Sequence, residues 1–317
     1  MKVQATARSD VIRCARYPSP VASTAIELDA ATVLLQWSVG GMFFGWWTTR
    51  HREVGLGYGW MLRITYGLMA VAACIVGLRY GAEAVRETTS ALVAVATLLA
   101  LSSSVVRRRA GVQGALNEHD RRSERVAAMT GIERSIDTST YDLRRGKEFD
   151  PRWDLAPVLV GCVGLISAGL AAAGPGLWTH GVSLARVLVG ALFLGAVTNA
   201  MLLGHWYLVQ PGLPRRHLND LVSALGRVWP LEVVSLLLPT GMASVLSGRI
   251  DDGWGGVLGW FWVACAATTF GLVIVTKAAL RERAYSAVMA ATGLLYLAIL
   301  TAFGTDLVAR AVLDSAS

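Results

Sequence analysis

The chain has 317 residues, of which 54% are hydrophobic and only 16% are charged, and its mean hydropathy is +0.49. Soluble domains usually carry about 25% charged residues, so this composition excludes a water-soluble globule. The apolar residues also come in blocks of about 18 or more, the length that crosses a hydrocarbon core. The formal net charge of +7 is typical of basic loops on the cytoplasmic side of a membrane. It does not require nucleic acid as a partner.

The sequence therefore predicts an all-α, polytopic transmembrane helix bundle of about eight spans, in a bacterial cell membrane. An N-terminal tail (1–29) precedes transmembrane helices one to three (30–106), a polar cytoplasmic connector (107–154) and transmembrane helices four to eight (155–317). No signal peptide is recognised in the first 30 residues, so the first span is expected to direct insertion. The expected spans are 31–48, 58–78, 89–106, 155–173, 182–209, 221–246, 257–276 and 284–308.

Two spans contain residues that predict special packing. Span one holds Gly41-x-x-x-Gly45, a spacing that lets two helices approach closely, and its Trp37 is interpreted as an interfacial aromatic, like the two tryptophans that follow. Span six contains Pro230 and Pro239. Because proline removes a helical hydrogen bond, this span is expected to be bent or split.

The connector 107–154 is the only long polar segment, with 11 basic and 9 acidic residues. Its middle, 112–132, is expected to form a surface helix, and 135–154 is expected to be extended. The N-terminal tail is expected to be mobile or to lie on the surface. A mixed-charge segment of this kind is usually solvated, although docking of a partner is an alternative.

The distribution of basic residues predicts the topology. With the connector inside, the inner segments 49–57, 107–154, 210–218 and 277–283 carry 18 basic residues and the outer segments carry 8. The positive-inside rule then places both termini outside. The four basic residues of the tail favour the cytoplasm instead, which a re-entrant first or second span would allow. The four cysteines, including Cys265, form no paired motif and are interpreted as small apolar residues packed among helices.

Charged residues inside apolar spans are the candidates for function, because charges at membrane depth are costly and face a bundle interior or a cavity. Arg186 and Asp306 lie near helix ends and are interpreted as anchors. Arg63, His205 and Glu232 are predicted to lie at similar depth on the cytoplasmic side. Together with Tyr207 and Asn199, they are the predicted lining of a polar ligand pocket. The alternative is that His205 is an interfacial residue and that Arg63 and Glu232 form a structural ion pair.

The sequence favours some classes of ligand for this pocket over others. A haem held by two histidines is disfavoured, because His180 would lie on the opposite membrane face from His205 and His51 lies in a loop. No group of residues has the spacing of a metal site, and the sequence names no cofactor and no catalytic residue. An amphiphilic ligand, a quinone or a lipid, or another membrane subunit suits a shallow polar pocket. Histidine titrates near neutral pH, which would suit a quinone.

The segment Gly204-His205-Trp206-Tyr207-Leu208, followed by Pro211 and Leu213, resembles a pattern of uncharacterised bacterial polytopic membrane proteins, as does 52–55. The resemblance covers about thirty residues and implies no activity. The leading hypothesis is a non-enzymatic membrane subunit or binding protein that holds an amphiphilic ligand or a partner in the pocket. The alternatives are a small-solute transporter working through the proline-broken sixth span and a haem-binding subunit.

Overall fold

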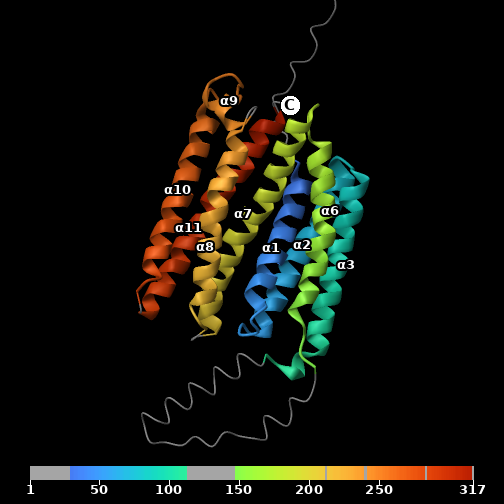
Figure 1. Cartoon of the computed structure of the whole chain (residues 1–317), viewed down its shortest axis with the longest axis vertical. Coiled ribbons are helices and arrows are strands. Elements are labelled where there is room, and N and C mark those ends of the chain that lie inside the picture. Colours follow the sequence, from blue (N-terminus) through green and yellow to red (C-terminus); the bar gives the residue numbers. More distant parts are fainter. Residues whose placement is uncertain (1–28, 113–146, 211–212, 239–240, 283, 316–317) are drawn as a thin grey trace, which may run out of the picture.

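The computed structural model describes residues 29–112, 147–210, 213–238, 241–282 and 284–315. Every regular element within these ranges is helical (Figure 1). The long helices are α1 (Ala30–Thr49), α2 (Leu56–Tyr80), α3 (Ala84–Val106), α6 (Leu155–Ala171), α7 (Leu177–Val209), α8 (Arg216–Leu237), α10 (Val257–Ala279) and α11 (Tyr285–Ser315). Shorter helices are η1 (Arg108–Ala110), η2 (Pro151–Asp154) and α9 (Met242–Leu246). The predicted tail and the predicted surface helix fall outside the described residues, apart from Asp29 and Val112.

Within the described ranges, six helices are long and apolar enough to cross a membrane, and the prediction of a polytopic helical membrane protein is thereby confirmed. They are α2, α3, α6 with the preceding η2, α7, α10 and α11. The first and sixth predicted spans are also helices, α1 and α8, but neither is among the six. Polar residues account for the shortfall in α8: Arg227, for example, is exposed and donates from Nε to the Ser223 carbonyl one turn nearer the helix start.

The sixth predicted span is interrupted, but not at both prolines. Pro230 lies inside a continuous α8, so the span is not split at this residue, and a bend there stays a prediction. Membrane helices tolerate such a proline where neighbouring groups compensate for the lost hydrogen bond. The helix does end at Leu237, and the separate short helix α9 begins at Met242. Pro239 lies outside the described residues.

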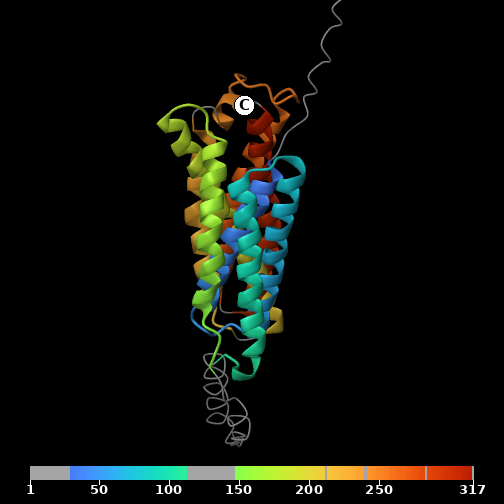
Figure 2. The same ribbon diagram turned by 90° about the vertical axis from the view of Figure 1, so that its right-hand side faces the viewer.

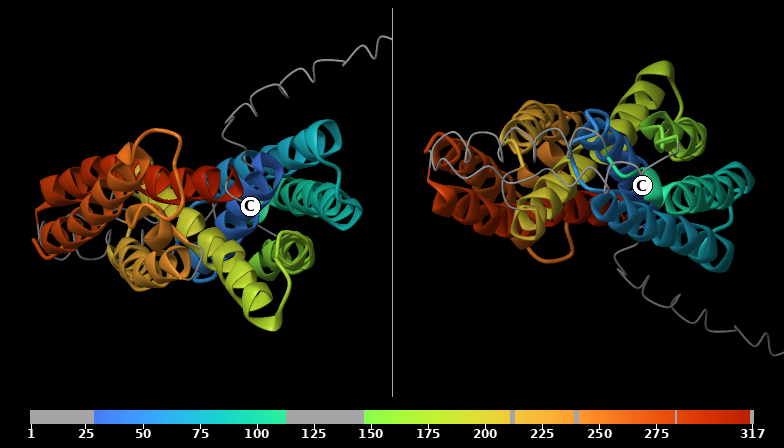
Figure 3. Two further views of the ribbon diagram at one scale, coloured as in Figure 1. Left: turned by 90° about the horizontal axis from the view of Figure 1, so that it is seen from above. Right: turned by 90° about the horizontal axis from the view of Figure 1, so that it is seen from below.

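The long helices run along one common axis (Figure 2) and form two rings of four. In the first ring α1 packs on α2, α2 on α3, α3 on α6, and α6 on α1. In the second ring α7 packs on α8, α8 on α10, α10 on α11, and α11 on α7. The rings meet where α1 packs against α7, at the centre of the molecule seen from above (Figure 3). The described long helices therefore form two up-and-down halves of four helices each, in the same order.

Small residues bring the two central helices together. A Cβ added to Gly40 would lie 1.7 Å from the carbonyl oxygen of Ala191, and one added to Gly195 would lie 2.2 Å from the carbonyl carbon of Gly40. Both glycines belong to one repeated pattern, Val-Gly-x-x-Phe-x-Gly, at 39–45 in α1 and 189–195 in α7. The repeat agrees with the order of helices in the two halves.

The predicted close approach at Gly41 and Gly45 is confirmed, and the partner helix is α2. A Cβ on Gly41 would lie 2.1 Å from the ring of Tyr66, and one on Gly45 would lie 3.0 Å from Leu62. The prediction that Trp37 lies at the membrane interface is wrong. Its indole N–H donates to Thr198 Oγ1 (2.9 Å) and its ring packs on Phe303 inside the bundle.

The described parts of the four predicted inner segments lie at one end of the bundle, here called the connector end (Figure 1). Glu53, between α1 and α2, accepts hydrogen bonds from Arg216 and His217 at the start of α8. Arg52 binds Glu148 of the polar connector at 3.2 Å. Arg215 donates to the carbonyl oxygens of Glu282 and Ala284 between α10 and α11. These contacts fix all four connections to one another.

At the opposite end, Asp252 organises the turn that leads into α10. Its Oδ1 accepts from the amides of Trp254 (2.9 Å) and Gly256 (2.8 Å), and its Oδ2 from the amide of Leu258 (2.9 Å). Gly256 adopts φ +87°, a left-handed conformation that favours glycine. The carboxylate therefore replaces the hydrogen-bond acceptors that the first turn of a helix lacks.

We expect Asp252→Ala to lower the free energy of unfolding by about 1 kcal/mol at neutral pH, the usual cost of losing a cap. The amides of Gly256 and its neighbours hold the pKa of this carboxyl below its usual value of 3.8. A carboxyl with a depressed pKa stabilises the fold at pH values above its unfolded-state pKa. This stabilisation is lost as the pH falls through the folded-state pKa. The difference between wild type and variant should therefore vanish in strong acid. Thermal unfolding at a series of pH values checks this, with Asp251→Ala, which loses a bond to one amide, as the control.

Candidate functional site

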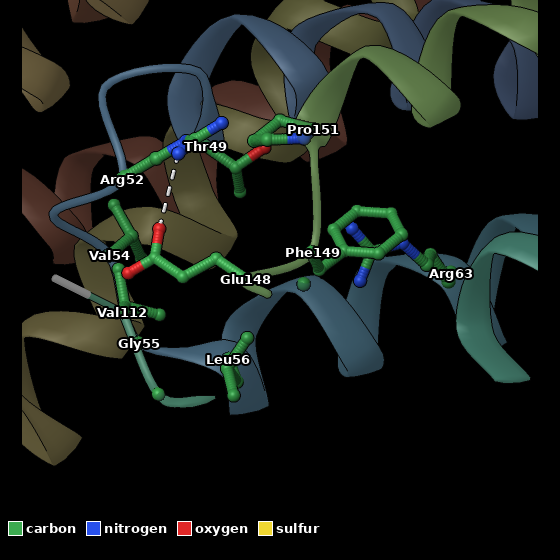
Figure 4. Close-up of a pocket in the computed structure, with 12 residues that line it drawn as sticks. Thr49, Arg52, Val54, Gly55, Leu56, Arg63, Val112, Glu148, Phe149 and Pro151 are labelled. Carbon is green, nitrogen blue, oxygen red and sulfur yellow. Dashed lines mark hydrogen bonds and ion pairs between the residues drawn. The ribbon is translucent and has the colours of Figure 1, made fainter. Parts of the chain in front are cut away.

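The residues predicted to line one cytoplasmic-side pocket do not come together. Arg63 forms a buried, two-pronged ion pair with Asp154, Nε to Oδ1 and Nη2 to Oδ2, both at 2.7 Å. The ring of Phe149 covers its guanidinium, whose carbon lies 4.3 Å from the ring centroid (Figure 4). The prediction that Arg63 balances Glu232 is therefore wrong. The true partner, Asp154, stands at the end of the polar connector.

The cavity beside Arg63 is too small for an organic ligand. It measures ≈ 30 Å³ and lies among the start of α2, the α1–α2 loop and the end of the connector (Figure 4). Ligand pockets usually measure about 300–1,000 Å³, whereas a cavity of this size holds one or two waters. We therefore interpret the Arg63–Asp154 pair as the attachment of the connector to the bundle.

The other predicted residues of the connector-end half also have separate partners. His205 is exposed on the outer surface, and its Nδ1 lies 3.3 Å from the hydroxyl of Tyr296. Tyr207 is buried, and its hydroxyl donates to the Pro214 carbonyl at 2.7 Å. Asn199 is buried in the core, where its amide nitrogen reaches the Tyr66 hydroxyl at 2.9 Å. His205 thus faces away from the groups with which it was predicted to form a pocket.

Glu232 lies in the opposite half of the bundle from Arg63. Helix α8 begins at Arg216, five residues before the predicted start of the span, and Glu232 is near its far end. Arg63 stands only about 10 Å along α2 from the connector end, whereas Glu232 is about 24 Å along α8. The prediction of a common depth is wrong because it depended on where α8 begins.

At this far end, four of the described helices contribute a group of buried and half-buried polar side chains, which we call the polar cluster. It contains Gln36 (α1), Arg186 (α7), Glu232 (α8), Asp306 and Arg310 (α11). Glu232 and Asp306 are fully buried, and Asp306, Arg310 and Arg186 are charged groups that act on Glu232 electrostatically. Arg310 binds Asp306 Oδ1 through Nε at 2.8 Å, one turn along the same helix.

The arginines of the polar cluster also tie helices together through main-chain carbonyls. Arg310 Nη2 donates to the carbonyl of Arg186 at 2.9 Å, and Arg186 Nε donates to the carbonyl of Ser235 at 3.0 Å. Gln36 donates to the carbonyl of Val187 at 2.6 Å. Gly190 provides the space, because a Cβ there would lie 2.3 Å from Arg310 Nη2. The cluster therefore holds α1, α7, α8 and α11 in register.

Arg186 and Arg310 also line a pocket at this far end, which measures ≈ 430 Å³ and lies within the usual size range of ligand sites. Its walls combine apolar side chains with a few polar groups, and Asp29 stands in the lining, bound to Arg86 at 2.6 Å. The pocket lies among the first turns of α1 and α7 and the last turns of α6 and α11. The remaining lining residues are Thr32, Val33, Ala168, Ala172, Ala173, Gly174, Trp178, Thr179, Val182, Ser183, Val187, Leu236, Ile250 and Leu313.

Sequence reasoning misjudged two members of the polar cluster. The sequence predicts that Arg186 and Asp306 are anchors near helix ends, but Asp306 is fully buried inside the bundle. Arg186 is half-buried, lines the pocket and donates to the Ser235 carbonyl. The spacing Asp306-x-x-x-Arg310 was the available signal, because residues four apart on a helix lie on one face. The link between Asp306 and Glu232 had no such signal, because it joins two helices.

Comparison of the chain with protein-family models, with curated proteins and with solved structures finds no match. Among the described residues, no group of three or more His, Cys, Asp or Glu side chains could hold a metal ion. His180 and His205 stand near opposite ends of α7, and His51 lies beside His217 at the connector end, with ring centroids 5.8 Å apart. The haem alternative stays a prediction.

Proposed function

We propose that the protein is a binding protein of the plasma membrane with eight membrane-crossing helices, which holds an amphiphilic anion in the pocket lined by Arg186 and Arg310. The observation that carries this proposal is the pair of guanidinium groups in a partly apolar pocket between membrane helices. The ligand class is the amphiphile predicted from the sequence, now restricted to those with a carboxylate or phosphate head. The proposed site lies at the end of the bundle opposite to the connector end, where the sequence predicted it.

The chemistry of the lining supports an anionic head with an apolar tail. Arginine presents several N–H donors in a planar fork that matches carboxylate and phosphate oxygens. Apolar walls formed by residues such as Val182, Leu236 and Leu313 suit an acyl chain. A neutral quinone lacks the charge that would use two guanidinium groups, so the anion is favoured over it.

The eight-span arrangement is supported by the position of α1 and α8 in the rings. Helix α1 packs against α2, α6 and α7, and more than half of its residues are buried, so its polar groups face protein. Helix α8 places Glu232 toward the interior, and its first turn carries the polar residues Arg216 and His217. With the basic connector end in the cytoplasm, the pocket faces the outer leaflet.

We expect purified protein in neutral-lipid nanodiscs to bind both dodecanoate and lysophosphatidate, and Arg186→Gln and Arg310→Gln each to weaken binding about tenfold to a hundredfold. The expected loss is that of one charge-assisted hydrogen bond, about 1.5–3 kcal/mol. The readout is quenching of Trp178, a pocket residue, by brominated forms of the two probes. Their relative affinities distinguish a free fatty acid from a lipid phosphate as the source of the head group.

The matched control is Arg249→Gln, which removes an exposed arginine at the same end outside the pocket lining. It should leave binding unchanged, and Trp178→Phe should remove the quenching. Binding that is insensitive to both arginines of the pocket, or that is equal for dodecyltrimethylammonium, a cation of similar length, would contradict the proposal.

Transport of the same anion is the second candidate, and the repeat of two four-helix halves favours it. Parallel repeats with a polar site between them occur in membrane transporters, and the polar cluster takes residues from both halves, Gln36 from the first and Glu232 from the second. The two candidates differ in one outcome of the same assay in sealed vesicles. A transporter would carry lysophosphatidate to the inner leaflet, whereas a binding protein would leave it in the outer leaflet.

A further inference from the structure

Two carboxyl groups from different helices lie side by side in the polar cluster. Glu232 on α8 and Asp306 on α11 are both fully buried, and Asp306 is a direct side-chain neighbour of Glu232. Neighbouring carboxylates in a low-dielectric interior repel each other strongly, and a proton held by one of them would remove this repulsion. The closeness of these groups requires a physical explanation of this kind.

The hydrogen bonding of the pair also favours a proton on one of the two carboxyl groups. Among the described residues, no donor reaches either carboxylate oxygen of Glu232 or Oδ2 of Asp306. Buried polar atoms are almost always hydrogen-bonded, and a carboxylate can only accept, whereas a protonated carboxyl donates. One proton held between the two groups supplies the missing donor. The amide oxygen of Gln36 lacks a described partner as well.

The charged groups around the pair determine the net charge of the polar cluster with and without this proton. Helix α7 contributes Arg186 and α11 contributes Arg310, while α1 contributes only the neutral Gln36. In α10 the described charged residue is Lys277, at the connector end. At the pocket, Asp29 is bound to Arg86, which also binds Glu87. With both carboxyls ionised the polar cluster is neutral, and with one shared proton its net charge is plus one.

We infer that Glu232 and Asp306 share one proton and that this proton makes the neighbouring pocket selective for anions. The inference rests on the proposed function, because it concerns the same pocket. When the proton is present, the excess positive charge of the cluster attracts an anionic head group. When the proton leaves to solvent, the acid becomes a second carboxylate and the attraction is lost.

Linkage sets the sign of the pH dependence. A ligand that binds the protonated cluster more tightly must raise the proton affinity of the pair. Over the pH range in which the free pair titrates, anion binding therefore takes up a proton from solvent. At higher pH the affinity falls, by about tenfold per pH unit where one proton is required.

The test uses decanesulfonate, a probe that stays an anion throughout the titration, so that only the protein changes charge. We expect isothermal titration calorimetry on the full chain in neutral-lipid nanodiscs to give an affinity that falls as pH rises. Glu232→Gln should bind at all pH values with the affinity that wild type has in acid, because the amide cannot ionise. Asp251→Asn, the same change at an exposed loop residue of the same end, should retain the wild-type pH dependence.

A second measurement needs no ligand. A protonated buried carboxyl gives an infrared carbonyl band that shifts in D2O, and this band should be present in wild type at neutral pH and absent from Glu232→Gln or Asp306→Asn. Wild-type binding that does not change with pH, or wild type without the band, would overturn the shared proton and leave the proposed function intact. The absence of sulfonate binding at every pH would overturn the inference, and absence of dodecanoate and lysophosphatidate binding as well would overturn the proposed function.

Discussion

Arg63→Ala is expected to lower the free energy of unfolding by about 3–5 kcal/mol, the usual cost of breaking a buried ion pair by removing one partner. The loss arises because Asp154, which is 3% exposed, would be left in the interior without its counter-ion and its two hydrogen-bond donors. The ring of Phe149 would also lose the guanidinium that it covers. Unfolding in mixed micelles with increasing dodecyl sulfate measures the difference.

Two further variants separate the ion pair from general damage at this end. The double variant Arg63→Leu with Asp154→Leu should lose less stability than either single change, because no unpaired charge remains. Arg52→Ala breaks the pair with Glu148 at the same end, where the arginine is 45% exposed, and should cost less than about 1 kcal/mol. Equal losses in all variants would contradict the assignment of a buried, specific pair.

Gly195→Ala and Gly40→Ala are expected to cost about 3 kcal/mol each, at the upper end of the range for overpacked interiors. The new methyl groups would meet main-chain atoms of the facing helix, 2.2 Å away for Gly195 and 1.7 Å away for Gly40. Main chain cannot rotate away as a side chain can. The helices α1 and α7 must therefore move apart, and the two four-helix halves with them.

The matched control is Gly271→Ala on α10, where no atom lies within 4 Å of the added Cβ. Because alanine favours helix over glycine by about 1 kcal/mol, this variant should be as stable as wild type or slightly more stable. Thermal unfolding of the three variants in one detergent gives the comparison. Tolerance of alanine at both Gly40 and Gly195 would show that α1 and α7 do not pack as closely as described.

The predicted ligand site does not form because its residues bind partners in other parts of the chain. Arg63 was correctly singled out as a charge that needs a partner inside the bundle, but the partner was sought in another span. Asp154 was assigned to a solvated connector, although it is buried at the start of α6. Its burial depends on the ring of Phe149 covering Arg63 and on η2 packing against α1, α3 and α6. No local sequence pattern predicts these contacts. A shift of five residues at the start of α8 likewise moved Glu232 to the other half of the bundle.

The sequence by itself determined that this is a helical membrane protein and where its long helices lie. These are local properties, because a run of apolar residues long enough to cross the bilayer must satisfy its own backbone hydrogen bonds as a helix. Only the tertiary structure decided which charges meet. The polar cluster takes Gln36, Arg186, Glu232 and Asp306 from four different helices. These side chains meet because the helices pack side by side and because Gly190 leaves space between them. Such packing depends on the whole surface of each helix, which the order of residues along one helix does not reveal.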